Sequence, residues 1–232
     1  MSNKRSKRYE KAVALVEEGK SYSLNDAVAL LKKFPAPKFD ATVTFSAHLG
    51  VDPRKSDQMV RGSVALPHGT GKKVKVIVFA SGDAAKAATD AGADEVGFED
   101  LIKKVQGGYT DFDAAIATPD AMTEVRKIAR VLGPRGLMPN PKTGIVTDDT
   151  ATAVNAVKAG RIDYKIDKSA NIAAACGKLS FSEEQLQENL GALVDSIVKA
   201  KPASAQGNYI QSFTLAASML PGISLDISSY IA

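Results

Sequence analysis

The sequence predicts a two-domain protein of mixed class, in which an α/β domain is inserted into an α+β domain. The middle of the 232-residue chain alternates between short apolar runs and helical segments, a pattern typical of a parallel sheet covered by helices. Both flanks combine amphipathic helices with strands of the kind found in antiparallel sheets. Neither flank holds enough strands for a stable sheet alone, so we expect the two flanks to pair with each other.

The predicted boundaries follow from this pairing. Residues 1–67 and 160–232 form a discontinuous α+β sandwich with an antiparallel sheet, and residues 68–159 form a Rossmann-like α/β domain with a parallel sheet. The chain crosses between the domains twice, at Pro67-His68-Gly69 and at Ala159-Gly160. These small and turn-forming residues predict a hinge at both crossings.

The N-terminal flank predicts amphipathic helices over residues 7–18 and 24–34, the second capped by Ser23 with Asp26 three residues later. Residues 42–49 alternate between apolar and polar side chains, which predicts a half-exposed strand. The predicted elements of the middle segment are strands at 75–80, 93–97, 113–118 and 145–146 and helices at 83–91, 99–106, 119–132 and 148–158. Those of the C-terminal flank are strands at 161–166, 172–179, 209–216 and 223–227 and a helix at 183–200.

Composition excludes several classes of protein. Cys176 is the only cysteine, so an intramolecular disulfide and a cysteine-based metal site are ruled out. With His48 and His68 as the only histidines, we expect no metal and no cofactor. No apolar run approaches a membrane span and the basic N-terminus lacks an apolar signal core, so we expect a soluble, cytoplasmic protein. Aromatic residues make up only 6 %, which is poor material for stacking many bases of a single strand.

The segment Gly133–Gly144 is a stiff loop with three prolines and three glycines. From Arg126 to Thr147 the chain carries five lysines and arginines and no aspartate or glutamate. A rigid cationic loop suits contact with a polyanion, although a tight connection with solvated charges is the alternative. Its candidate contact residues are Arg130, Arg135 and Lys142.

Nucleotide-binding motifs are weak in this chain. Gly69-Thr70-Gly71-Lys72-Lys73 resembles a phosphate loop, but Lys73 stands where Ser or Thr is needed and the glycines precede a strand. No Gly-x-Gly-x-x-Gly follows a strand of the middle segment. An α/β protein or enzyme that binds a small molecule remains an alternative, and it would need a pocket at the carboxyl ends of the parallel strands.

The exposed face of the predicted antiparallel sheet is a stronger candidate. Hydroxyls, lysines and one aromatic on a sheet suit structured RNA, which is held through phosphates and 2′-hydroxyls with limited stacking. An ordinary solvated sheet face is the alternative. The residues expected on or beside this face are Lys38, Phe39, Thr42, Thr44, Ser46, Tyr164, Lys165, Asp167, Lys168, Ser212, Thr214, Ser218 and Met219.

Several motifs, in order along the chain, resemble one family. They are Asp52-Pro53-Arg54-Lys55-Ser56-Asp57-Gln58, Val60-Arg61-Gly62, Leu66-Pro67-His68-Gly69-Thr70-Gly71, Ala91-Gly92-Ala93-Asp94, Phe112-Asp113, Ala117-Thr118-Pro119-Asp120 and, most specifically, the loop Gly133–Gly144. Together they are similar to the bacterial "L-one" family, the ribosomal protein of the mobile side stalk beside the transfer-RNA exit site.

The resemblance implies a non-enzymatic protein of the large ribosomal subunit, present there as a monomer and binding large-subunit (23S-type) ribosomal RNA at the stalk. It implies help in releasing deacylated transfer RNA from the exit site and repression of translation by binding its own messenger. A repressor that binds only the messenger and never joins ribosomes is the alternative. Carried over by position, the RNA-contact residues are Lys38, Phe39, Thr42, Asp167, Lys168, Ser212, Ser218 and Met219.

Three positions depart from the family pattern. Thr-Met-Gly near the C-terminus is replaced by Ser218-Met219-Leu220, and we expect Leu220 to resist the positive φ that glycine adopts. Ala170 stands at a usual glycine, and Ala173 at a usual histidine. These changes are expected to weaken or reshape RNA contact without abolishing it.

Overall fold

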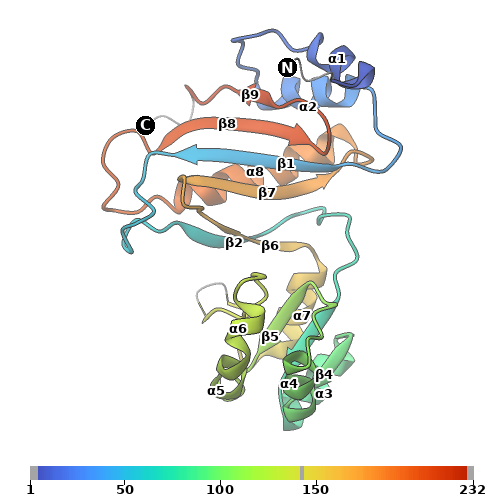
Figure 1. Ribbon diagram of the computed structural model, residues 1–232, viewed down its shortest axis with the longest axis vertical. Helices are drawn as coiled ribbons and strands as arrows, with labels where there is room; N and C mark the ends of the chain where they lie inside the picture. Colours follow the sequence, from blue (N-terminus) through green and yellow to red (C-terminus); the bar gives the residue numbers. More distant parts are fainter. Residues whose placement is uncertain (1–4, 142–143, 229–232) are drawn as a thin grey trace. The chain divides into compact units, whose positions relative to one another are not determined.

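The computed structural model describes residues 5–141 and 144–228 and divides into two compact units (Figure 1). Unit 1 comprises Met1–Gly71 with Ile162–Ala232, and unit 2 comprises Lys72–Arg161. The predicted fold class is confirmed, because unit 1 carries an antiparallel sheet and unit 2 a parallel one. The unit boundaries fall two to four residues beyond the predicted crossings at 67/68 and 159/160.

Unit 1 is built on a sheet with strand order β7-β1-β8-β9. Its strands are β1 (Thr42–Leu49), β7 (Asn171–Lys178), β8 (Ile210–Ala217) and β9 (Ile223–Leu225), and all neighbours are antiparallel. The helices α2 (Leu24–Lys33) and α8 (Glu183–Lys199) pack against it, and Figure 1 shows α8 behind the strands. The sheet therefore has one covered face and one open face.

Local sequence signals explain these helices. Ser23 accepts the Asp26 backbone N–H at the start of α2, as expected for a cap. Ser182 and Gln185 form a reciprocal capping box at the start of α8. The buried face of α8 meets the inward side of β1 and β8, where Phe45 and Phe213 pack with ring centroids 5.0 Å apart. This apolar cluster is the core of unit 1.

Two parts of unit 1 differ from expectation. The first helix, α1 (Lys7–Val13), ends five residues before the predicted end at residue 18. The strand β2 (Arg61–Ala65), paired with β6 (Arg161–Lys165), was not predicted. Every residue of β2 is at least partly exposed, so the strand lacks the apolar alternation that identifies a strand in sequence.

Unit 2 is a parallel sheet in the order β4-β3-β5, formed by β4 (Glu95–Gly97), β3 (Val76–Phe79) and β5 (Ala114–Ala117). All of β3 is buried, because helices cover both of its faces. Ile77 and Phe79 face one apolar cluster, and Val76 and Val78 face another. The covering helices are α3 (Gly82–Asp90), α4 (Glu99–Gln106), α5 (Met122–Val125), α6 (Ala129–Leu132) and α7 (Thr150–Lys158).

The helix predicted over residues 119–132 is not continuous. It is divided into α5, a 3₁₀ turn at Arg126–Ile128 and α6. The buried side chains Val125, Ile128 and Leu132 still face one core cluster across the break. The helix of this segment thus keeps its apolar side while its backbone tightens at the centre.

The predicted hinge residues are held by local contacts. Buried Asn189 on α8 accepts the His68 backbone N–H at 3.0 Å and donates to the carbonyls of Gly69 and Cys176 at 3.0 and 2.9 Å. The residues Ala159 and Gly160 instead close the C-terminus of α7 in unit 2. A hinge between the units remains a prediction.

Candidate nucleic-acid interface

The open face of the unit 1 sheet is defined by its strand register. Thr42, Thr44, Ser46 and His48 alternate with fully buried neighbours along β1, as the sequence predicts. Cross-strand pairing places polar and small side chains in rows around them. The rows are Lys178–Thr42, Ala175–Thr44–Ala216, Ala173–Ser46–Thr214–Ser224 and Asn171–His48–Ser212. The open face therefore presents hydroxyl and methyl groups together with one amide, one imidazole and one lysine.

One end of this face is a cluster around Thr42. Lys178 Nζ donates to the Thr42 hydroxyl at 2.8 Å, and the Ser218 backbone N–H donates to the Thr42 carbonyl at 3.0 Å. Phe39, just before β1, is 48 % exposed although it is a large apolar side chain. The structure therefore brings the predicted residues Thr42 and Ser218 together, with the predicted Lys38 and Phe39 exposed in the segment leading into β1.

Met219 is the most unusual residue of this cluster. Its side chain is 67 % exposed, and its φ of 62° lies in the left-handed region that side chains disfavour. The turn is held by the Leu220 N–H, which donates to the Ala217 carbonyl at 2.9 Å, and by Arg8, which donates to the Met219 carbonyl. Strained and exposed apolar residues concentrate at functional sites.

Leu220 does not adopt a positive φ, in agreement with its expected resistance to that conformation. The positive φ of this turn belongs to Met219, and Leu220 is buried in the core of unit 1. Glycine is therefore not required at residue 220 for the turn to form, because the left-handed conformation lies one residue earlier. The larger side chain adds packing instead of strain.

The opposite end of the face contains the row Asn171–His48–Ser212. His48 Nδ1 and Asn171 Oδ1 lie 2.8 Å apart, so the imidazole orients the amide. The predicted Ser212 is exposed beside them on β8. The predicted Asp167 accepts the backbone N–H groups of Ser169 and Asn171, both at 2.8 Å. The N–H of Asn171 holds the pKa of Asp167 below its ordinary value, so this carboxylate fixes the turn that carries exposed Lys168.

Ala170 in the same turn also has a positive φ, of 61°. Its methyl group is accommodated in the core, but the conformation costs an L-residue about 1–2 kcal/mol. This departure from glycine is thus a strain on the turn, held in place by the Asp167 hydrogen bonds. Ala173, the other departure, is exposed in the middle of the open face.

The predicted residues form two groups and not one. Thr42 and His48 are six residues apart on β1, so the two ends of the face are about 20 Å apart. Sequence reasoning missed Lys178 and Asn171 as members of the face. These two residues lie on the open face because β7 pairs with β1 at Thr42 and His48. A register shift between Val43 and Thr44 means that this pairing cannot be predicted from the apolar–polar alternation alone.

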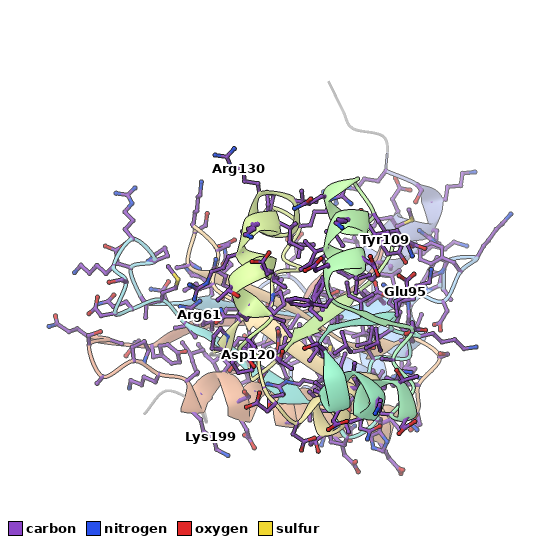
Figure 2. All side chains as sticks on the ribbon, turned by 90° about the horizontal axis from the view of Figure 1, so that it is seen from below. Arg61, Glu95, Tyr109, Asp120, Arg130 and Lys199 are labelled. Atoms are coloured by element: carbon purple, nitrogen blue, oxygen red, sulfur yellow. The ribbon has the colours of Figure 1, made fainter. Side chains whose placement is uncertain are left out.

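The cationic loop belongs to unit 2. Leu137 and Met138 pack against its core and Pro139 is buried, which explains apolar residues in the middle of a loop. The guanidinium of Arg135 donates to the Thr110 hydroxyl. Arg130 on α6 is exposed, and Figure 2 shows its side chain extending away from the ribbon. Lys142, the third predicted cation, lies outside the described residues.

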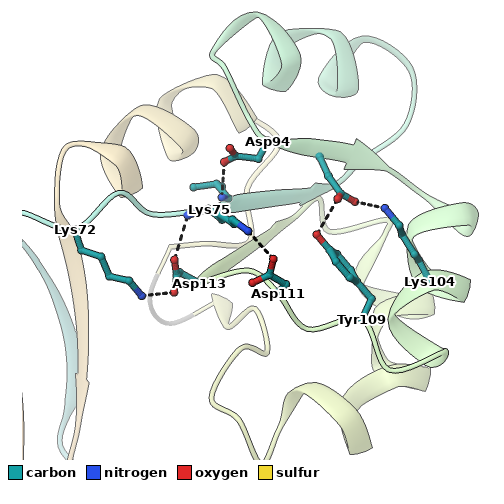
Figure 3. Close-up of polar contacts among 9 residues, drawn as sticks. Lys72, Lys75, Asp94, Lys104, Tyr109, Asp111 and Asp113 are labelled. Carbon is teal, nitrogen blue, oxygen red and sulfur yellow. Dashed lines mark hydrogen bonds and ion pairs between the residues drawn. The ribbon is translucent and has the colours of Figure 1, made fainter.

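The remaining polar cluster of unit 2 is an ion-pair network (Figure 3). Lys72 pairs with Asp113, Lys75 with Asp111, and Glu95 accepts from Lys104 and Tyr109 at 2.9 and 2.8 Å. The hydrogen bond from Lys104 lowers the pKa of Glu95. These pairs join the segments on either side of the parallel sheet's strands.

Within the described residues 5–141 and 144–228, no group of three or more histidine, cysteine, aspartate or glutamate side chains is arranged to hold a metal ion. Across the same residues, none of the helices has the length and apolar character that crossing a membrane requires.

The class of the protein is that of ribosomal proteins, which are not enzymes. The chain belongs to the ribosomal protein L1p/L10e family, whose family model matches residues 31–221. Among curated relatives is the large ribosomal subunit protein uL1 of Renibacterium salmoninarum, 56 % identical over 96 % of this chain and 95 % of the relative. This chain is also similar to proteins of the same name from two other organisms. The protein from Clavibacter michiganensis is 53 % identical over 97 % of this chain and 99 % of the relative. The protein from Lactobacillus delbrueckii is 56 % identical over 96 % of this chain and 96 % of the relative.

Proposed function

We propose that this chain is a constituent of the large ribosomal subunit and binds large-subunit ribosomal RNA at the mobile stalk through the open face of unit 1. The observation that carries the proposal is the register of that face, which lines up hydroxyls and the Asn171 amide over about 20 Å between two lysine-bearing ends. The names of the relatives, which are large-subunit proteins at 53–56 % identity, support the assignment to the large ribosomal subunit.

The chemistry of each end suits a different part of the RNA. At the Thr42 end, Lys178 and Lys38 meet phosphates, while exposed Phe39 and Met219 pack on sugars and bases. At the other end, Lys168 meets phosphate and the Asn171–His48–Ser212 row offers donors and acceptors to 2′-hydroxyls. Between them the small side chains Ala173, Ala175 and Ala216 let the backbone of the RNA lie flat on the sheet.

Two further roles rest on the family resemblance. We propose that the unit 2 loop bearing Arg130 and Arg135 meets a second nucleic-acid surface, the stalk RNA or the departing transfer RNA, and so assists its release. We also propose that the open face recognises a similar structure in the protein's own messenger and represses its translation. The chemistry that binds one structured RNA serves for the other.

Binding to a stalk RNA fragment and co-sedimentation with large subunits test the proposal together. Fragment binding with co-sedimentation supports the ribosomal role. Fragment binding without co-sedimentation favours a repressor that acts on the messenger alone. A thermal-shift screen with nucleotides and metabolites addresses the small-molecule alternative, since a true ligand raises the melting temperature by mass action.

A further inference from the structure

A hollow of about 500 Å³ lies in unit 1 beside the turn that carries Lys168. It is lined by Pro53 and Met59 from the loop after β1 and by the end of β6 with its following turn, namely Lys165, Ile166, Asp167 and Lys168. The side chain of Met59 is 36 % exposed there. This volume is within the range of small-ligand sites, and of its lining the function proposed above uses only Lys168.

Both walls of the hollow are braced. In the loop, Gln58 accepts the Asp52 N–H at 2.8 Å and donates to the Ser204 carbonyl at 3.2 Å. On the other side, the Ile166 N–H donates to the Val60 carbonyl at 2.9 Å, which ties the end of β6 to the residue after Met59. The turn that follows is closed by Asp167. A preformed hollow loses little entropy when it takes up a ligand.

The chemistry of the hollow combines an apolar floor with a cationic rim. Pro53, Met59 and Ile166 supply flat or polarizable surface, and a methionine sulfur contacts aromatic rings favourably. Lys165 and Lys168 are exposed on the rim, and Arg54 and Lys55 follow Pro53 in the same loop. The carboxylate of Asp167 already accepts two backbone N–H groups. This arrangement suits a ring that is flanked by negative charge.

We propose that the hollow takes up one unpaired nucleobase of the RNA bound on the open face, with its flanking phosphates on Lys165 and Lys168. The inference rests on the proposed RNA-binding function and names a specificity site within it. Continuity supports an RNA base as the occupant, because Lys168 belongs both to the hollow and to the predicted RNA-contact residues. An unpaired base is required, since bases within a helix are stacked and cannot enter a pocket.

The test is a cycle between protein and RNA variants, using the full chain and a stalk RNA fragment. Each unpaired nucleotide of the fragment is replaced in turn by an abasic one, and affinities are measured for the wild type and for Met59→Ser. One abasic position should weaken binding to the wild type about 2- to 10-fold. The same position should have no further effect on Met59→Ser, because the contact is already lost. Lys199→Gln, on the exposed surface of α8, serves as the control variant.

A second readout is the methyl resonance of Met59 in protein labelled at methionine methyl groups. A base stacked on the thioether shifts this resonance upfield through its ring current, while buried Met122 in unit 2 stays unchanged. If the fragment binds in a Phe39-dependent way, but no abasic position is coupled to Met59→Ser and the Met59 methyl resonance does not shift, the proposed base pocket is overturned and the proposed function stands. Absence of any selective fragment binding overturns the proposed function, and this inference with it.

Discussion

Replacing Met219 by glycine should make the protein more stable and weaken its binding to RNA. The residue adopts φ 62° and is 67 % exposed, so it contributes strain and little packing. The left-handed conformation costs an L-residue about 1–2 kcal/mol relative to glycine. Glycine also gives the unfolded chain more conformational freedom, which lowers the stability of the variant by about 0.4–1 kcal/mol. The expected net stabilisation of Met219→Gly is therefore about 0–1.6 kcal/mol, with a midpoint of about 0.8 kcal/mol.

Two assays separate the effects. Amide exchange in β8 and β9, which flank residue 219, should slow about 2- to 5-fold where it proceeds through unfolding of unit 1. The binding free energy of Met219→Gly for the stalk RNA fragment should be about 1–3 kcal/mol less favourable than that of the wild type, the loss expected for a central contact. Met219→Ala is the matched control, because it removes the side chain and keeps the strained backbone. Alanine should lower affinity as glycine does and leave stability unchanged.

The reasoning about Met219 is refuted by either of two results. A glycine variant less stable than the wild type would show that the turn does not store strain. A glycine variant of unchanged affinity would show that the exposed side chain does not meet RNA.

Three further predictions concern unit 1. Burial raises the pKa of the Cys176 thiol to about 12 in the folded protein, whereas a cysteine thiol in the unfolded chain has a pKa of about 8.5. The stability that comes from burying the neutral thiol is therefore fully present below about pH 8.5. The free energy of unfolding should then fall by up to about 1.4 kcal/mol per pH unit above pH 8.5, and Cys176→Ala should lose that dependence in denaturant titrations at several pH values. Asn189→Ala should lower the free energy of unfolding by about 2–4 kcal/mol, since it leaves buried hydrogen-bonding groups unpaired. Glu188→Gln, which removes the charge from the exposed contact with His68, should lower it by less than about 1 kcal/mol in the same titration. Equal losses would contradict a structural role for the buried Asn189 amide. Lys178→Gln should weaken RNA binding and reduce the slope of log K against log salt by about 1. A slope equal to that of the control variant Lys199→Gln would show that Lys178 does not contact RNA phosphates.

Much of the fold could be predicted from the sequence because its signals are local. The alternation in Thr42–Leu49 identified β1 with its bounds and its exposed side. The apolar run of β3 and the alanine-rich segment after it identified the parallel unit. β2 could not be found, since its pairing with β6 depends on a contact about 100 residues away in sequence and not on apolar alternation.

The candidate site was only partly predictable for a related reason. Strand periodicity tells which side chains share a face of one strand, and register tells which ones meet across strands. Lys178 therefore became visible as a partner of Thr42 only after pairing was known. The turn at Ser218–Leu220 shows the same limit at the level of the backbone. The family resemblance implied a positive φ at residue 220, and the structure places the positive φ at Met219.

The most direct test of the central claim is the affinity of the full chain for a stalk RNA fragment and for an unrelated duplex, measured across a salt series with the wild type and Phe39→Ala. The account predicts selective binding of the fragment that survives moderate salt, and a loss of about 1–3 kcal/mol in the variant. Weak and equal binding of both RNAs that disappears as salt rises, with no effect of Phe39→Ala, would contradict it and leave only a non-specific basic surface.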